Sequence, residues 1–154
     1  MYNLTGEYDC KLDSKGRLKL PSQLVRQLGG DTTLLFTINR GFENCLVLYP
    51  KNVWEQKTKE LDQLNMYVAK NRQFVRYFYR GATQVATDAA DRILIPKSLI
   101  EHGNMDKEVV LLAFKDQVEI WSKEQYNNML DNEPEDFAQL AEDVFGGAGA
   151  GDND

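Results

Sequence analysis

The sequence contains little cysteine and almost no histidine. Its 154 residues include two cysteines, Cys10 and Cys45, and one histidine, His102. The cysteines lie far apart and lack CxxC spacing, so the sequence predicts reduced core thiols, as in a cytosolic protein, and no disulfide framework. One histidine and two scattered cysteines do not supply the ligand set of a zinc site. We therefore expect neither a metal nor another cofactor.

Long hydrophobic runs are missing as well. No run approaches the roughly 18 apolar residues that cross a bilayer. Residues 1–5 lack the basic flank and apolar core of a signal peptide. The chain is 42% apolar and 27% charged, a composition typical of a soluble globular protein. We expect a cytoplasmic protein with no membrane partner.

Acidic residues outnumber basic ones, 24 to 18, which gives a formal net charge of −6. The charge is unevenly placed, however. Residues 131–154 contain eight acids and no base, whereas residues 1–130 contain 16 acids and 18 bases. The body of the chain therefore carries a charge of about +2, which is compatible with a DNA partner. Two roles stay open for the acidic segment: it competes with DNA for the basic faces, or it serves solubility alone.

The strongest feature that the sequence does contain is an internal repeat. Residues 13–21, DSKGRLKLP, recur 75 positions later at residues 88–96 as DAADRILIP. The match extends outward in register to further pairs: Gly6 with Gly81, Leu24 with Leu99 and Val25 with Ile100. Two copies are too few for a solenoid, so the repeat predicts a pseudo-two-fold pair of small units.

Each copy is expected to form two strands, a helix and two more strands. In the first copy, strands 7–12 and 17–20 flank a turn at 14–16 and form either a hairpin or a bent strand. A helix between Pro21 and Gly29 follows, and then strands 34–38 and 45–49. In the second copy, helix 96–102 precedes strands 109–114 and 118–121.

Further helices are expected between and after the copies. Segments 51–64 and 68–80 read as helices, and the second places Arg72, Arg76 and Arg80 on one stripe. That stripe is either a solvated face that forms salt bridges with neighbouring acids, or a contact surface for DNA or a neighbouring subunit. A short helix is expected around 123–130 and a last one from Glu133 to about Val144. The predicted division is repeat 1 at 7–53, a helical connector at 54–81, repeat 2 at 82–125, a C-terminal helical segment at 126–145 and a disordered acidic, glycine-rich tail at 146–154.

The first copy has one apolar and one basic face around its turn. Apolar residues alternate with polar ones, so Cys10, Leu12, Leu18 and Leu20 share one face. The other face carries four bases and one acid: Lys11, Lys15, Arg17, Lys19 and Asp13. This face is either ordinary solvated surface or, as we favour, a contact for a polyanion.

The paired Asp-x-x-Gly-Arg-x-x-x-Pro motif resembles that of the SpoVT/AbrB-like swapped-hairpin DNA-binding domains. Two tandem copies resemble the MraZ family of bacterial transcriptional regulators in particular. The segments Leu48-Tyr49-Pro50…Trp54 and Arg72-Gln73-Phe74-Val75-Arg76 add to the likeness, which covers about residues 1–130.

The resemblance implies an α+β fold, in which two β-β-α-β-β repeats form a pseudo-two-fold swapped-hairpin β-barrel with added helices. It also implies a nucleoid-associated homo-oligomer, in the form of a ring, that binds short direct repeats in double-stranded promoter DNA upstream of the cell-division and cell-wall gene cluster. The DNA-reading positions fall on Lys15, Gly16 and Arg17, while the second copy keeps Arg92 and has Asp91 in place of the glycine. With the basic face, the candidate DNA-binding residues are Lys11, Lys15, Gly16, Arg17, Lys19 and Arg92. We expect no small-molecule ligand.

The second copy has lost most of the basic face. At the repeat offset, Lys11, Lys15 and Lys19 correspond to Ala86, Ala90 and Leu94. We therefore expect the first copy to read DNA and the second mainly to build the fold. We also expect the carboxylate of Asp91 to repel phosphate. Asp91 is adjacent to Arg92 in the sequence and could pair with it.

Parts of the sequence are compatible with two other functions. Asp13 and Asp88 could form a carboxylate pair for acid–base catalysis, but an aspartate before a turn more often binds the N–H groups of that turn. No nucleophile–base pair or phosphate-binding loop accompanies them, so we expect no enzyme and no catalytic residue. The remaining alternative is a protein-interaction module of the antitoxin-like swapped-hairpin type.

Overall fold

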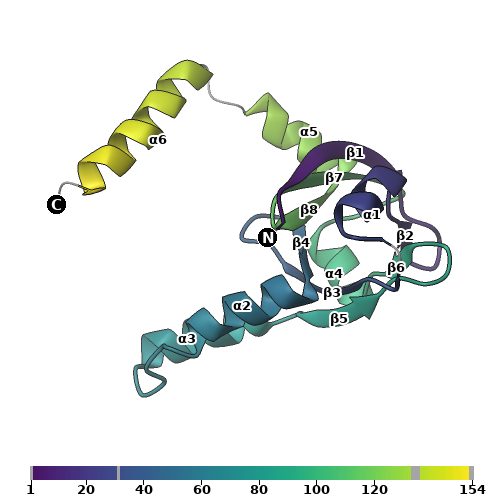
Figure 1. Cartoon of the computed structure of the whole chain (residues 1–154), viewed down its shortest axis with the longest axis horizontal. Helices are drawn as coiled ribbons and strands as arrows, with labels where there is room; N and C mark the ends of the chain where they lie inside the picture. Colours follow the sequence, from purple (N-terminus) through teal and green to yellow (C-terminus); the bar gives the residue numbers. More distant parts are fainter. Residues whose placement is uncertain (1, 31, 133–135, 153–154) are drawn as a thin grey trace.

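The computed structural model describes residues 2–30, 32–132 and 136–152, with side chains described as far as Gly146 (Figure 1). The first repeat comprises β1 (Leu4–Lys11), β2 (Arg17–Lys19), α1 (Ser22–Gln27), β3 (Leu35–Arg40) and β4 (Leu46–Pro50). The second comprises β5 (Thr83–Ala86), β6 (Arg92–Leu94), α4 (Lys97–His102), β7 (Glu108–Lys115) and β8 (Gln117–Ser122). Helices α2 (Lys51–Leu61) and α3 (Ala69–Tyr79) lie between the repeats, and α5 (Lys123–Asp131) and α6 (Phe137–Asp152) follow them. The predicted α+β class and the order of elements in both repeats are confirmed.

The two repeats exchange strands. Six antiparallel strands form one sheet in the order β1-β7-β8-β4-β3-β5, and β2 pairs with β6 in a separate two-stranded ribbon. Replacing each strand by its counterpart in the other repeat reproduces the same order reversed, as a pseudo-two-fold relation requires. The first strand of each repeat thus pairs with the third strand of the other.

The expected closed barrel is not found among the described residues. β1 and β5 are the outer strands of the six-stranded sheet and do not pair with each other. Of the two alternatives for the first turn, a hairpin or a bent strand, the hairpin is limited to one antiparallel bridge, Leu12 to Leu18. Strand β2 otherwise pairs along its length with β6 of the other repeat. Alternation of apolar residues predicts which face of a strand is buried, but it does not identify the neighbouring strand.

Both repeats contribute to one hydrophobic core. Leu18 and Ile93, which are partners across the ribbon, are fully buried, and Leu24 of α1 and Leu99 of α4 are buried with them. Of the apolar face predicted for the first turn, Leu12, Leu18 and Leu20 are buried and Cys10 is half-buried, which confirms the prediction. Side chains of this size stabilise the fold by about 1.5–3 kcal/mol each when buried. Neither repeat has this core by itself.

Helices α2 and α3 form a hairpin beside the sheet (Figure 1). The ring of Trp54 stacks on that of Phe78 at 5.5 Å and lies 5.4 Å from that of Tyr49. Side chains of β3 bind the carbonyls at the end of α3: Asn39 Nδ2 donates to Phe78 O at 2.6 Å, and Arg40 Nη2 donates to Tyr77 O at 3.0 Å. These donors satisfy carbonyls that the helix end leaves without an intrahelical partner.

The predicted arginine stripe is wrong at one position. Arg72 and Arg76 belong to α3, whereas Arg80 is its C-terminal cap and has an extended backbone, with ψ of 118°. Among the described residues no ion pair engages any of the three, so the salt-bridged alternative is not seen. Arg72 Nη1 instead donates to Met66 O at 2.9 Å.

The C-terminal segment also differs from the prediction. Helix α6 continues to Asp152, whereas disorder was expected from Gly146 onward. Extending an existing helix by a residue is far less costly than nucleating one, which allows a poor helix-forming segment to continue it. The expected helix start at Glu133 and the last two residues of the tail lie outside the described residues. No helix in the described part of the chain is long and apolar enough to cross a membrane.

Both cysteines are free thiols. Cys45 is buried, and Cys10 is half-buried against the core. Burial raises the pKa of Cys10 to about 11 and that of Cys45 to about 12. The prediction of reduced core thiols is thus consistent with their surroundings.

Candidate nucleic-acid interface

The two turns are built in the same way around an aspartate. Asp13 Oδ1 accepts hydrogen bonds from the backbone N–H groups of Lys15 at 2.9 Å and Arg17 at 2.8 Å. In the second repeat Asp88 Oδ1 accepts from the N–H groups of Ala90 and Arg92, both at 2.9 Å. Each aspartate therefore organises its own turn, as the sequence predicts.

Each aspartate also holds an arginine. Asp13 Oδ2 accepts from Arg17 Nε at 2.7 Å, and Asp88 Oδ2 accepts from Arg92 Nε at 2.8 Å. The backbone hydrogen bonds from Arg17 and Arg92 are the largest cause of a lowered pKa at Asp13 and Asp88. The expected pairing of Arg92 with Asp91 is wrong, because the carboxylate four residues earlier takes the Nε donor. Within the described residues no hydrogen bond engages the Nη atoms of either arginine.

Each turn also contains one residue whose backbone lies in the left-handed region. Gly16 has φ of +86° and Asp91 has φ of +58°, so aspartate does replace glycine here without loss of the turn. Their carbonyls join the two repeats: Ile95 N donates to Gly16 O at 2.8 Å, and Leu20 N donates to Asp91 O at 2.9 Å. Gly16 is buried, and a Cβ there would lie 3.2 Å from Ile95 O.

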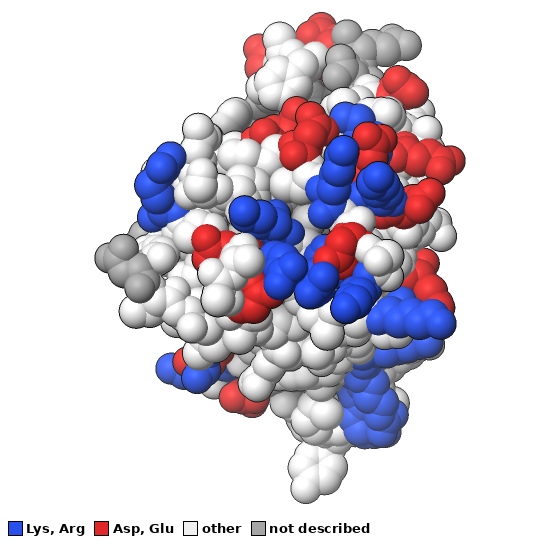
Figure 2. All heavy atoms as spheres, turned by 90° about the vertical axis from the view of Figure 1, so that its right-hand side faces the viewer, with Lys and Arg blue, Asp and Glu red and all other residues white. Residues whose placement is uncertain are grey.

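The ribbon brings cations of both repeats onto one face. In its antiparallel register Lys19 lies opposite Arg92, and Arg17 lies opposite Leu94. Leu18 and Ile93 point into the core between these pairs, so the flanking side chains lie on the outer face. The side chains of Arg17 and Arg92 are 33% and 35% exposed. Figure 2 looks onto this side of the molecule and shows lysines and arginines gathered near its middle, with carboxylates between them.

The remaining candidates lie around this ribbon. Lys15 is exposed in the first turn, whereas Lys11 ends β1 and lies opposite Glu108 of β7, off the ribbon. Lys107, which the sequence analysis did not select, lines a hollow beside Gly16, and its carbonyl accepts a hydrogen bond from Leu12 N at 2.7 Å. No local pattern marks Lys107, because its position follows from the pairing of β1 with β7.

A model of the MraZ protein family, which is described as antitoxin-like, matches residues 4–77 and again residues 78–146. The chain belongs to the MraZ family. It is 44% identical over 147 residues to the transcriptional regulator MraZ of Christiangramia forsetii, covering 95% of each chain. It is 40% identical over 147 residues to that of Flavobacterium psychrophilum, covering 95% of this chain and 94% of the relative. For the MraZ of Cytophaga hutchinsonii the identity is 37% over 138 residues. The two matches to the family model coincide with the two repeats, and these relatives are named as regulators of transcription and not as enzymes.

Proposed function

We propose that the chain is a sequence-specific DNA-binding transcriptional regulator whose ribbon β2–β6 and first turn contact double-stranded DNA. The observation that carries the proposal is the pair of arginines on one face, each held through Nε by an aspartate. Such anchoring fixes the direction of a guanidinium while its Nη groups stay available to a ligand. The names of the MraZ relatives support the same function.

The ribbon suits the major groove, which admits a two-stranded antiparallel ribbon. Arg17 and Arg92 would donate to the acceptors of guanine, while Lys15 and Lys19 would bind flanking phosphates. Lys11, beyond the end of the ribbon, would add a further phosphate contact. Gly16 would act through its backbone, since a side chain at this buried left-handed position would strain the turn.

Oligomerisation would supply the affinity that one chain lacks. The body of one chain carries about +2, a small charge for a DNA-binding surface. Several linked copies on short direct repeats gain affinity through effective concentration. The resemblance to MraZ regulators supports a ring of copies, in the cytoplasm at the nucleoid, on repeats upstream of the cell-division and cell-wall genes. The exchange of strands between repeats likewise supports a fold of the swapped-hairpin type.

The experiment is a footprint of the purified chain on DNA upstream of its own gene, followed by titration of the protected box and of random DNA over a range of salt concentrations. We expect protection of repeated boxes and an affinity that falls steeply with salt. A monomer that binds the repeated boxes no better than random DNA would contradict the proposal.

A second candidate function is an antitoxin-like protein-interaction module, which the description of the family model favours. Affinity purification from the native host distinguishes the two. One stoichiometric protein partner, with no DNA retained, would support the second candidate.

A further inference from the structure

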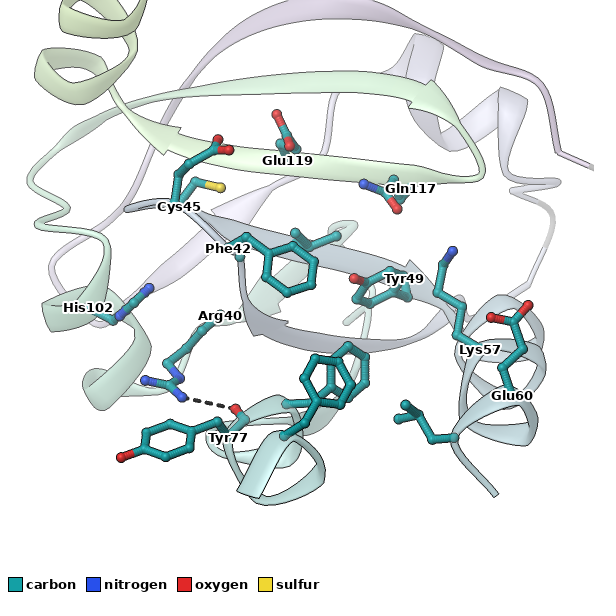
Figure 3. Close-up of a pocket in the computed structure, with 16 residues that line it drawn as sticks. Arg40, Phe42, Cys45, Tyr49, Lys57, Glu60, Tyr77, His102, Gln117 and Glu119 are labelled. Carbon is teal, nitrogen blue, oxygen red and sulfur yellow. Dashed lines mark hydrogen bonds between the residues drawn. The ribbon is translucent and has the colours of Figure 1, made fainter. Parts of the chain in front are cut away.

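A cleft between the sheet and the α2–α3 hairpin is walled by aromatic rings. It has a volume of about 610 Å³ (Figure 3). The rings come from the loop after β3, from β4 and from α3, and belong to Phe42, Tyr49, Phe74, Tyr77 and Phe78. Phe42 is 89% exposed and Tyr77 is 60% exposed, so these two rings border open space. Clefts of this size with an aromatic lining commonly hold small molecules.

The charged lining of the cleft is predominantly acidic. Three carboxylates, those of Glu43, Glu60 and Glu119, line it against two bases, Arg40 and Lys57. Three acids and two bases give the lining a formal charge of −1. Among the described residues no ion pair engages any of the three carboxylates. The cleft is therefore suited to a positively charged ligand.

Both bases of the cleft already have partners within the chain. Arg40 donates through Nε to Arg80 O and through Nη2 to Tyr77 O, each at 3.0 Å (Figure 3). The ammonium group of Lys57 lies 5.9 Å from the centre of the Tyr49 ring. The carboxylates are thus the charged groups of the cleft that are left to bind a ligand.

Glu43 and Glu119 act on the same end of the cleft. The charges of both raise the pKa of Cys45, after the larger effect of its burial. Glu119 is half-buried, and its Oε1 accepts one hydrogen bond, from Trp121 Nε1 at 3.0 Å. Burial raises the pKa of Glu119, and the charge of Glu43 raises it further. His102, which lines the same end, does not offset this negative charge, because burial lowers its pKa. A bound cation would relieve the cost of these neighbouring carboxylates.

We propose that the cleft binds a small organic cation, with a flat apolar group among the rings and a protonated amine or amidine at Glu119 and Glu43. Aromatic faces attract both an apolar group and a cation, and the carboxylates complement the charge. The sequence did not predict this ligand, because the lining comes from both repeats and from the connector between them. The cleft shares no residue with the ribbon, so the inference does not depend on DNA binding.

The experiment measures the binding of three matched probes to the full chain in the absence of DNA. Phenethylammonium supplies the cation, phenethyl alcohol is its neutral isostere, and phenylacetate is an anion of similar size. Titrations followed by saturation-transfer NMR give the dissociation constant of each probe. We expect phenethylammonium to bind at least about fivefold more tightly than the alcohol, and phenylacetate to bind most weakly. Equal binding of the cation and the alcohol, or no saturation transfer to the cation, would overturn the proposal.

Substitutions locate the bound cation in the cleft. Glu119→Gln removes a charge but keeps an oxygen that can accept from Trp121, and Glu43→Gln alters an exposed loop residue, so the fold should persist in both. Each is expected to reduce the preference for the cation over the alcohol by about threefold. The control, Glu124→Gln, removes an exposed carboxylate of α5 outside the cleft and should leave the preference unchanged. The same preference in the parent chain and all three variants would overturn the proposal.

The same titrations distinguish other occupants of the cleft. Binding of phenethylammonium that weakens as the chain concentration rises would assign the cleft to a second copy and overturn the proposal. A lost preference for the cation in Glu119→Gln, with unchanged binding to a DNA box, would support the proposal and separate this site from the proposed function.

Discussion

Arg17 and Arg92 each bind an aspartate through Nε, and among the described residues their Nη groups make no hydrogen bond. Their Nε atoms bind Asp13 and Asp88, and this fixes each guanidinium plane against its own turn. A lysine could not do the same, since its single ammonium group cannot bind a carboxylate and a base edge in a fixed planar geometry. If the proposed function holds, this arrangement predicts the role of each side chain in DNA binding.

We expect Arg17→Ala to weaken binding to the specific box by about 1–3 kcal/mol per site and to relax sequence preference, because a base-reading contact is lost. Lys15→Ala should weaken binding to all sequences alike and reduce the salt slope by about one unit. Arg92→Ala should have a smaller effect, because its own repeat has lost most of the lysines, although Lys19 lies opposite it. Titration of each folded variant against the same box measures these effects. Abolished binding in Arg92→Ala with unchanged binding in Arg17→Ala would reverse the assignment.

The two turn aspartates predict a loss of stability in acid. Their pKa values are lowered in the folded chain, so their contribution to stability is complete above about pH 4, near the pKa of an unfolded aspartate. It is lost as the pH falls through the lower folded values. The melting temperature should thus fall below about pH 4, and it should fall less in an Asp13→Asn, Asp88→Asn double variant. An equal fall in the melting temperature of the two proteins between pH 7 and pH 2 would contradict this prediction.

At the scale of elements, the hairpin α2–α3 depends on donors from β3. The side chain of Asn39 is buried, and its amide supplies the hydrogen bond to the carbonyl of Phe78. That bond and the stacking of Trp54 on Phe78 connect the hairpin to the sheet. The orientation of α3 therefore rests on one buried polar side chain and an aromatic cluster.

We expect Asn39→Ala to lower the free energy of unfolding by about 1–3 kcal/mol, because it leaves a partly buried carbonyl without its donor. Amide exchange in α3 should accelerate. Asn71→Ala is the control, since it removes a more accessible hydrogen bond to Asn65 O and should change stability by less than about 0.5 kcal/mol. Urea unfolding and hydrogen exchange measure both variants. Equal losses in the two would argue against a special role for Asn39.

At the scale of the whole molecule, the exchange of strands makes the two repeats one folding unit. β1 and β2 find their partners in β7 and β6, on the far side of the connector. Leu18 and Ile93 are buried against each other's repeat. Cutting the chain between the repeats would expose this shared core and leave the strands unpaired.

Residues 1–81 alone are consequently expected not to form a folded monomer. They should be unfolded, or they should associate with a second copy that replaces the missing repeat. Circular dichroism combined with light scattering over a range of concentrations distinguishes these states. Adding residues 82–154 should restore the native spectrum. A stable, folded monomer of 1–81 would show that strand exchange is not required.

Local features of this protein were determined by its sequence. The repeat predicted two matching units, and the aspartates of residues 13–21 and 88–96 were predicted to bind the N–H groups of their turns. Alternation of apolar residues predicted that Leu18 and Leu20 are buried. These features depend on residues within a few positions of one another, where turn chemistry and side-chain periodicity act directly.

The tertiary structure alone decided which segments meet. It placed Lys19 beside Arg92, made Arg40 a donor to the end of α3 and left the sheet open between β1 and β5. Alternation specifies the buried face of a strand but is equally satisfied by any neighbouring strand of similar pattern. Pairing is chosen by the packing of the whole core, to which residues some 75 positions apart contribute together. That choice, which no local pattern encodes, is what assembles one basic face from two repeats.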